Sequence, residues 1–63
     1  MIINGKKFDF ENITITEMLK NLNLEEKKVV VEVNFEIIAK ESFNEFILDK
    51  ASKVEIVSFI GGG

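Results

Sequence analysis

The chain closes with the stretch Val54-Glu55-Ile56-Val57-Ser58-Phe59-Ile60-Gly61-Gly62-Gly63, which holds three of the four glycines of the sequence. The residues before the glycines are mostly β-branched or aromatic, and this composition predicts a strand. Side chains along a strand point alternately to its two faces. One face would carry Val54, Ile56, Ser58 and Ile60, and the other Glu55, Val57 and Phe59. Glycine adds nothing to a core, so we expect a folded domain over residues 1–60 and a flexible tail over residues 61–63.

The beginning of the chain predicts a β-hairpin over residues 1–10. Asn4-Gly5 suits a type I′ turn, because both central residues of that turn need a positive φ. The segment from Lys6 to Phe10 alternates between polar and apolar residues, with Phe8 and Phe10 on one face. This period of two is typical of a strand with one buried face.

A capping box marks the start of a helix of two to three turns. The Thr14 hydroxyl can accept from the Glu17 amide, and the Glu17 side chain can reach back to the Thr14 amide. An apolar stripe at i, i+3, i+4 and i+7 follows, and it consists of Ile15, Met18, Leu19 and Leu22. We expect this stripe to pack against a sheet, and Asn21 and Asn23 to mark the end of the helix.

The second half of the chain predicts three further strands. Residues 29–33 form a β-branched run that suits a central strand, residues 34–36 a turn, residues 37–38 a short strand and residues 54–60 the last one. Residues 39–53 show no clear period. We expect this stretch to be anchored to the core, around one irregular helical turn, by Phe43, Phe46, Ile47 and Leu48. The order of elements predicts an α+β fold with the helix on one face of the sheet.

Composition excludes most catalytic chemistry. The 63 residues predict one domain without room for a deep cleft. The absence of Cys and His leaves no thiolate nucleophile, no zinc cluster and no serine–histidine triad, so we expect no metal and no enzyme. A net charge of −3 argues against nucleic acid as a partner. No apolar run approaches the ~18 residues of a membrane span, and no signal peptide is apparent, so we expect a cytoplasmic protein.

The glycine tail is the feature that packing does not explain. Phosphate-binding loops place their glycines between a strand and a helix, and nothing follows Gly63 here. A terminal carboxylate next to glycines can enter a narrow channel, and three extended residues span roughly 10 Å. A partner would have to activate that carboxylate, as an acyl-phosphate type of anhydride, before sulfur or an amine could displace the leaving group. A frayed end or a cloning remnant would have the same composition, so both interpretations stay open.

Val57 and Phe59 are candidates for docking a partner. If the face of the last strand that carries Val54 packs on the helix, these two side chains lie on the open side of the sheet, next to the tail. An exposed apolar spot there would suit a partner protein. The alternative is that residues 39–48 cover them.

Four segments carry a resemblance to a known family. They are Ile2-Ile3-Asn4-Gly5, Thr16-Glu17-Met18-Leu19, the run from Val31 to Ile38 and the closing stretch from Val54 to Gly63. Through them the chain resembles, over nearly its whole length, the ThiS family of sulfur carrier proteins of thiamine biosynthesis. It departs from the family at residues 49–53, where members often have an Asp-Gly-Asp-like turn, and near residues 40–43, which lack a frequent Pro.

The resemblance implies a ubiquitin-like β-grasp, with a mixed sheet of four to five strands packed on one helix. It implies that Gly62 and Gly63 are the sulfur-carrying pair and that Gly61 lengthens the tail for access. A ThiF-like adenylating enzyme, of the ubiquitin-activating type, would adenylate the Gly63 carboxylate. The ATP would belong to that partner, and this chain would bind no cofactor. A sulfur donor would then make the thiocarboxylate, which a ThiG-like thiazole synthase would use.

Three alternatives remain open at this stage. The first is the related sulfur carrier that forms the small subunit of molybdopterin synthase. The second is a ubiquitin-like interaction module whose glycine tail is inert, and the third is a modifier that is conjugated to other proteins.

Overall fold

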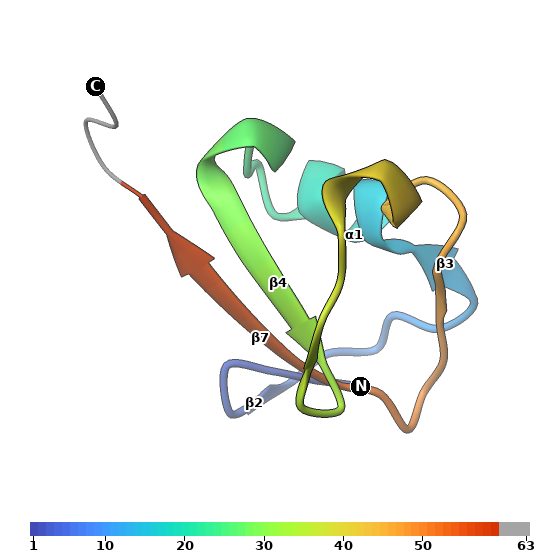
Figure 1. Ribbon diagram of the computed structural model, residues 1–63. Helices are drawn as coiled ribbons and strands as arrows, with labels where there is room; N and C mark the ends of the chain where they lie inside the picture. The colour runs from blue at the N-terminus through green and yellow to red at the C-terminus, as the bar shows by residue number, and fades with distance from the viewer. Residues whose placement is uncertain (60–63) are drawn as a thin grey trace.

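One helix packs against one face of a five-stranded mixed sheet over residues 1–59, which are the residues that the computed structural model describes (Figure 1). The strands are β1 (Ile2–Ile3), β2 (Lys6–Lys7), β3 (Ile13–Thr14), β4 (Val29–Val33), β5 (Glu36–Ile37), β6 (Ile47–Leu48) and β7 (Lys53–Ser58). The helix is α1 (Ile15–Asn21), and Glu26–Lys28 and Lys40–Ser42 form 3-10 turns. The predicted α+β architecture is confirmed.

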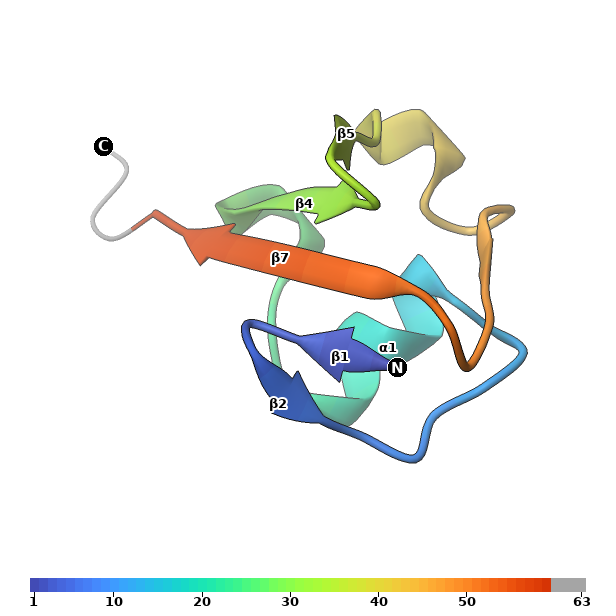
Figure 2. The same ribbon diagram turned by 90° about the horizontal axis from the view of Figure 1, so that it is seen from below.

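The sheet has the strand order β2-β1-β7-β4-β5, so the last strand in sequence is the middle strand in space (Figure 2). β1 and β7 are parallel, and every other neighbouring pair is antiparallel. Figure 2 shows α1 behind the sheet, so the face toward the viewer is the one that α1 does not cover. We call it the open face. The mixed sheet implied by the resemblance is confirmed, and β4 is an interior strand, as its β-branched run predicts.

The core lies between α1 and the covered face of the sheet. Alternate residues of β4 and β7 point into it, as the period of two requires. The predicted helix stripe is confirmed, because Ile15, Met18 and Leu19 are at most 1% exposed and Leu22 is half-buried. The buried apolar side chains are Met1, Ile3, Ile15, Met18, Leu19, Val29, Val31, Val33, Phe43, Leu48, Val54 and Ile56. Burying one such large side chain is worth about 1.5–3 kcal/mol, so this cluster supplies most of the stabilisation.

The start of α1 is fixed by the predicted capping box. The Glu17 N–H donates to Thr14 Oγ1 at 3.1 Å, and the Thr14 N–H donates to Glu17 Oε1 at 2.8 Å. Two donors that the first helical turn cannot satisfy internally are thereby paired. The helix ends at Asn21, and Asn23 turns the chain with φ 59°.

The N-terminal hairpin is shorter than predicted. Asn4 and Gly5 have φ of 50° and 83°, which suits the predicted turn type. The predicted strand from Lys6 to Phe10 is wrong beyond Lys7, where β2 ends. Two hydrogen bonds between Met1 and Phe8 close the pairing with β1, and no residue of β1 remains to pair with Asp9 and Phe10. The chain then leaves the sheet edge, with Phe8 and Phe10 stacked at 5.5 Å between ring centroids and packed against the core.

The segment between β5 and β7 contributes one strand, β6, to a second, two-stranded sheet that the sequence did not reveal. β3 and β6 pair antiparallel beside α1, through Ile13↔Leu48 and Thr14↔Ile47. Phe43 and Leu48 are fully buried and Phe46 packs against the core, as predicted. Ile47 is 57% exposed, so its predicted role as an anchor is wrong. It alternates with Leu48 and points outward.

Two strand boundaries also differ from the prediction. β5 covers Glu36–Ile37 instead of residues 37–38, because the turn uses only Asn34 and Phe35. β7 begins at Lys53 and ends at Ser58. Ile60 and the predicted tail over residues 61–63 lie outside the described residues.

Two asparagines clamp β7 in place. Asn4, in the turn after β1, accepts from the Ile56 N–H at 2.7 Å and donates from Nδ2 to the Ile56 carbonyl at 3.2 Å. Asn34, in the turn after β4, accepts from the Lys53 N–H at 3.0 Å, and its own N–H donates to the Lys53 carbonyl at 2.8 Å. Each side chain substitutes for a backbone partner that a longer neighbouring strand would have supplied.

We predict that Asn4→Gly lowers the free energy of unfolding by about 1–3 kcal/mol, because the Ile56 amide and carbonyl lose their partners. Asn4→Ala should cost roughly 1 kcal/mol more, since alanine disfavours a positive φ and glycine does not. Urea titration followed by circular dichroism measures both, because the chain has no Trp or Tyr. Asn44→Ala, at an exposed loop position, is the control. Equal stability of Asn4→Gly and wild type would contradict the clamp.

Candidate functional site

The end of β7 is the anchor point of the segment that leads to the glycines. β1 pairs with β7 only at Lys53 and Val54, so the later half of β7 extends beyond β1 (Figure 2). There it is bonded to β4, up to the pair Val29↔Ser58. The Phe59 N–H continues this ladder by donating to the Lys28 carbonyl at 2.8 Å. The chain is therefore held by the sheet as far as Phe59.

Val57 and Phe59 lie where the sequence predicts them. Val57 is 60% exposed on the open face, and Phe59 is 46% exposed. The alternative, that residues 39–48 cover them, holds only for one side of Phe59. The Lys40 Nζ lies 5.8 Å from the centre of the Phe59 ring and donates to the Val29 carbonyl at 2.9 Å. Lys40 thus supports Phe59 from the β4 side and leaves nearly half of its surface free.

The open face carries more apolar surface than the two predicted residues. Val30 lies directly opposite Val57, and Ile37 of β5 lies opposite Glu32. Ile37 is 71% exposed. The sequence analysis missed both residues. A signal for Val30 was available, because a strand with an apolar residue at every position except Glu32 must expose apolar side chains on a face that no helix covers.

Phe35 is an unusual exposed residue beside this face. It is 80% exposed and has φ 72°, in the left-handed region that bulky side chains rarely adopt. The Lys53 Nζ lies 5.4 Å from the centre of its ring, within cation–π range. The sequence analysis placed Phe35 in a turn and gave it no role.

Over residues 1–59, no group of three or more Asp, Glu, His or Cys residues is placed to hold a metal ion. In the same residues, no helix has the length and apolar character to cross a membrane.

Ser52 is a buried polar residue that is satisfied by Asp49. The Ser52 hydroxyl accepts from the Asp49 N–H at 3.0 Å and donates to Asp49 Oδ1 at 3.3 Å. It shapes the turn before β7.

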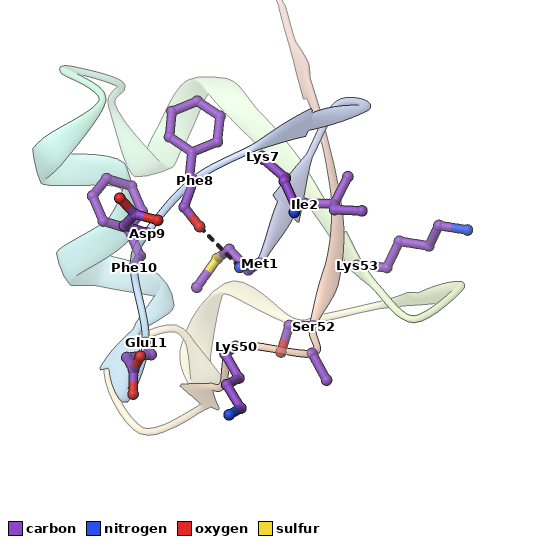
Figure 3. Close-up of a pocket in the computed structure, with 11 residues that line it drawn as sticks. Met1, Ile2, Lys7, Phe8, Asp9, Phe10, Glu11, Lys50, Ser52 and Lys53 are labelled. Carbon is purple, nitrogen blue, oxygen red and sulfur yellow. Dashed lines mark hydrogen bonds between the residues drawn. The ribbon is translucent and has the colours of Figure 1, made fainter.

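One hollow in the described part of the chain lies far from the end of β7. It has a volume of about 620 Å³ and lies between the N-terminus, residues 7–11 and the turn at residues 50–53 (Figure 3). Lys53 begins β7 and Ser58 ends it, so the two ends are about 17 Å apart at the usual rise per residue of a strand. This hollow therefore lies at the opposite end of β7 from Ser58.

Comparison with known proteins decides the family. The model of the ThiS family matches residues 1–63 of the chain. The chain belongs to the ThiS family. The sulfur carrier protein ThiS of Bacillus subtilis is 44% identical over 63 residues, and the match covers 97% of this chain and 96% of that protein. A thiazole synthase of Paramagnetospirillum magneticum is 39% identical over 64 residues, and this chain spans only a fifth of its length.

Solved structures agree with the family assignment. The crystal structure of the thiamine biosynthesis protein ThiS from Geobacter metallireducens superposes with a TM-score of 0.79 at 32% identity, and the match covers 98% of this chain and 96% of that one. The fold predicted by resemblance, a ubiquitin-like β-grasp with a mixed sheet of four to five strands, is thereby confirmed, and its main sheet has five.

We predict that Lys40→Met loosens the end of β7. Methionine keeps the length and apolar stem of lysine but loses the bond to the Val29 carbonyl and the contact with the Phe59 ring. The exchange rate of the Phe59 amide hydrogen should rise severalfold, as expected for a locally weakened ladder end. Hydrogen exchange followed by NMR measures this, with Lys27→Met at an exposed position as the control. An unchanged Phe59 rate would show that Lys40 gives no support.

Proposed function

We propose that the chain is a sulfur carrier protein of thiamine biosynthesis and acts as a carrier, without catalysing the reaction itself. The observation that carries the proposal is the match of the whole chain to the ThiS family, combined with a sequence in which Gly62-Gly63 follows the last strand. The names of the B. subtilis and G. metallireducens relatives support the same pathway.

In the proposed mechanism Gly63 is the terminal residue, and its carboxylate is the reacting group. A ThiF-like enzyme joins that carboxylate to the AMP part of ATP and releases pyrophosphate. The donor supplies sulfur at the oxidation level of hydrosulfide, which attacks the carboxyl carbon. A carbon–sulfur bond forms, and AMP leaves with the electron pair of the bond that breaks. The resulting thiocarboxylate gives its sulfur to thiazole synthase. Since the chain has neither His nor Cys, the partners supply acid–base and sulfur chemistry, and the adenylating enzyme binds the ATP. We place these steps in the cytoplasm, because they consume ATP.

The number of residues after Phe59 supports a mechanism in which partner enzymes carry out the chemistry on the Gly63 carboxylate. Four residues follow Phe59 in the sequence. They reach about 14 Å at most when extended. A partner that acts on the Gly63 carboxylate must therefore bring its reaction centre within that distance of Phe59, and its surface would then meet Val57 and Phe59. The tail residues Gly61, Gly62 and Gly63 leave no side chain to obstruct a narrow channel.

One relative supports thiazole synthase as a partner. A fifth of the thiazole synthase of P. magneticum is similar to this whole chain. A segment of the carrier type within a thiazole synthase is expected if the two act on each other, because tethering raises their effective concentration. The ThiF-like adenylating enzyme is proposed from the chemistry alone, since a free carboxylate does not accept sulfur without activation.

The molybdopterin alternative has less support, because the two curated relatives above are named for the thiamine pathway. Stable purification with a large synthase subunit would favour it. A module with an inert tail would keep its activity after deletion of Gly62 and Gly63, and a conjugated modifier would appear as isopeptide-linked adducts.

We predict that incubation with ATP, the ThiF-like enzyme and a sulfur donor raises the intact mass by the difference between sulfur and oxygen. Tandem mass spectrometry should place that change at Gly63. A variant with one phenylalanine added after Gly63 should show no gain, because the added side chain obstructs the channel.

Circular dichroism of the extended variant is the control, and its spectrum and unfolding curve should match those of the wild type. A wild-type chain whose mass stays unchanged under these conditions would refute the carrier function.

We predict that Val57→Asp weakens binding to the adenylating enzyme by at least tenfold, because a carboxylate would be buried in an apolar contact. Stability should change by less than about 1 kcal/mol, since the Val57 side chain is 60% exposed. The matched control is Ile47→Asp in β6, where the replaced side chain is 57% exposed and away from β7. Isothermal titration calorimetry compares the two. Equal weakening by both variants would argue against docking at Val57.

A further inference from the structure

We infer that the partner surface that docks on the open face presents an arginine or lysine, surrounded by apolar groups, which binds Glu32 and Glu55 together. This inference rests on the proposed function, because it takes docking at Val57 as given, and it adds the chemistry by which the partner is recognised.

The register of β4 and β7 brings the two carboxylates together. Glu32 and Glu55 lie directly opposite each other in the antiparallel ladder. Residues at such positions have their Cβ atoms about 4.5–5.5 Å apart. Their sequence neighbours Val31, Val33, Val54 and Ile56 are buried against α1. Both carboxylates therefore point to the open face.

Among residues 1–59, the sole ion pair within 4.0 Å joins Lys28 and Glu25. The nearest lysine on the same face of β7 is Lys53, two residues before Glu55, and its ammonium lies over the Phe35 ring at 5.4 Å. Two like charges directly opposite each other destabilise a sheet. The described part of the chain thus holds two glutamates that repel each other in its main sheet, and none of its lysines forms an ion pair with either of them.

Apolar residues adjoin this pair along the sheet and across it. Val57 and Val30 form the next pair on the same face of the ladder, and Ile37 lies across from Glu32. Val57 and Ile37 are 60% and 71% exposed. A partner that covers both of these side chains must also cover Glu32, which lies next to each, and so removes water from the carboxylates.

Removing water from two carboxylates is strongly unfavourable unless a cation pairs with them. The partner must therefore supply positive charge at this point, and the apolar surroundings require it to be a single side chain set among apolar groups. An arginine guanidinium suits the position best, because its planar fork of donors can bond to two carboxylates at once. In the free carrier, water solvates the two carboxylates. In the complex, the positive side chain of the partner binds both carboxylates and offsets their repulsion.

The test compares Glu32→Gln, Glu55→Gln and the double variant for binding to the ThiF-like enzyme and to thiazole synthase. Calorimetric titrations are made at low and at high salt. Each single substitution should weaken binding to at least one of these partners by about tenfold or more, and the double variant should lose most of the salt dependence of the wild type. Glu45→Gln, at an exposed position that is not in the main sheet, removes the same charge and is the matched control.

Stability provides a second measurement that separates recognition from structure. Because the variants relieve repulsion, their unfolding midpoints should equal or exceed that of the wild type. A clear fall in the midpoint would assign the pair a structural role and overturn the inference. Affinities that match the wild type would also overturn it, as would a wild-type chain whose glutamates bind Mg²⁺ tightly or join two copies of the chain.

The outcome is distinguishable from failure of the proposed function. If Val57→Asp abolishes binding and the glutamine variants do not weaken it, docking on the open face stands and the basic side chain is refuted. If the wild type neither gains sulfur nor binds either enzyme, the proposed function itself fails.

Discussion

Hydrogen bonding to β7 from both sides is the constraint on which the rest of the molecule depends. β1, from the start of the chain, pairs with it in parallel, and β4 pairs with it antiparallel over five residue pairs. In the sequence, the helix and the two strands of the second sheet come between β1 and β7. Because the middle strand comes last in the sequence, the core cannot close until nearly the whole chain is in place. Such long-range pairing is expected to make folding slow for a domain of this size.

The same arrangement fixes the point from which the residues after Phe59 continue. β7 is bonded on both sides in its first half, and beyond Val54 only the Asn4 side chain replaces β1. The later half therefore extends beyond the edge of β1 and stays paired with β4 as far as Phe59. A strand anchored in the middle of the sheet gives a well-defined point of departure for the residues that follow. In the proposed function, the domain over residues 1–59 would serve recognition, and the residues that follow Phe59 in the sequence would serve access.

Local interactions were predictable from the sequence, and long-range ones were not. The capping box of Thr14 and Glu17, the helix stripe and the Asn4-Gly5 turn depend on residues at most a few positions apart, and each is confirmed. The pairing of Ile13 with Leu48 leaves no local pattern, so the second sheet was missed. For the candidate site, alternation along β7 placed Val57 and Phe59 on one face but left open whether residues 39–48 cover them. Their exposure, Ile37 and the Glu32–Glu55 pair became visible only in the structure.

The two faces of the main sheet differ in how well their side chains are satisfied. On the side of α1 the apolar side chains are buried, and every buried side-chain nitrogen and oxygen in residues 1–59 has a partner. The open face instead exposes Val57 and Ile37 and places Glu32 opposite Glu55, while the adjacent turn holds Phe35 at a positive φ, which costs about 1–2 kcal/mol. A domain of 63 residues has about 3–9 kcal/mol of stability in total. Costs of this size, gathered on the open face and its rim, are expected where a surface serves binding more than folding. A partner that docks here as proposed would gain the free energy of burying Val57 and Ile37, which the free carrier leaves exposed to water.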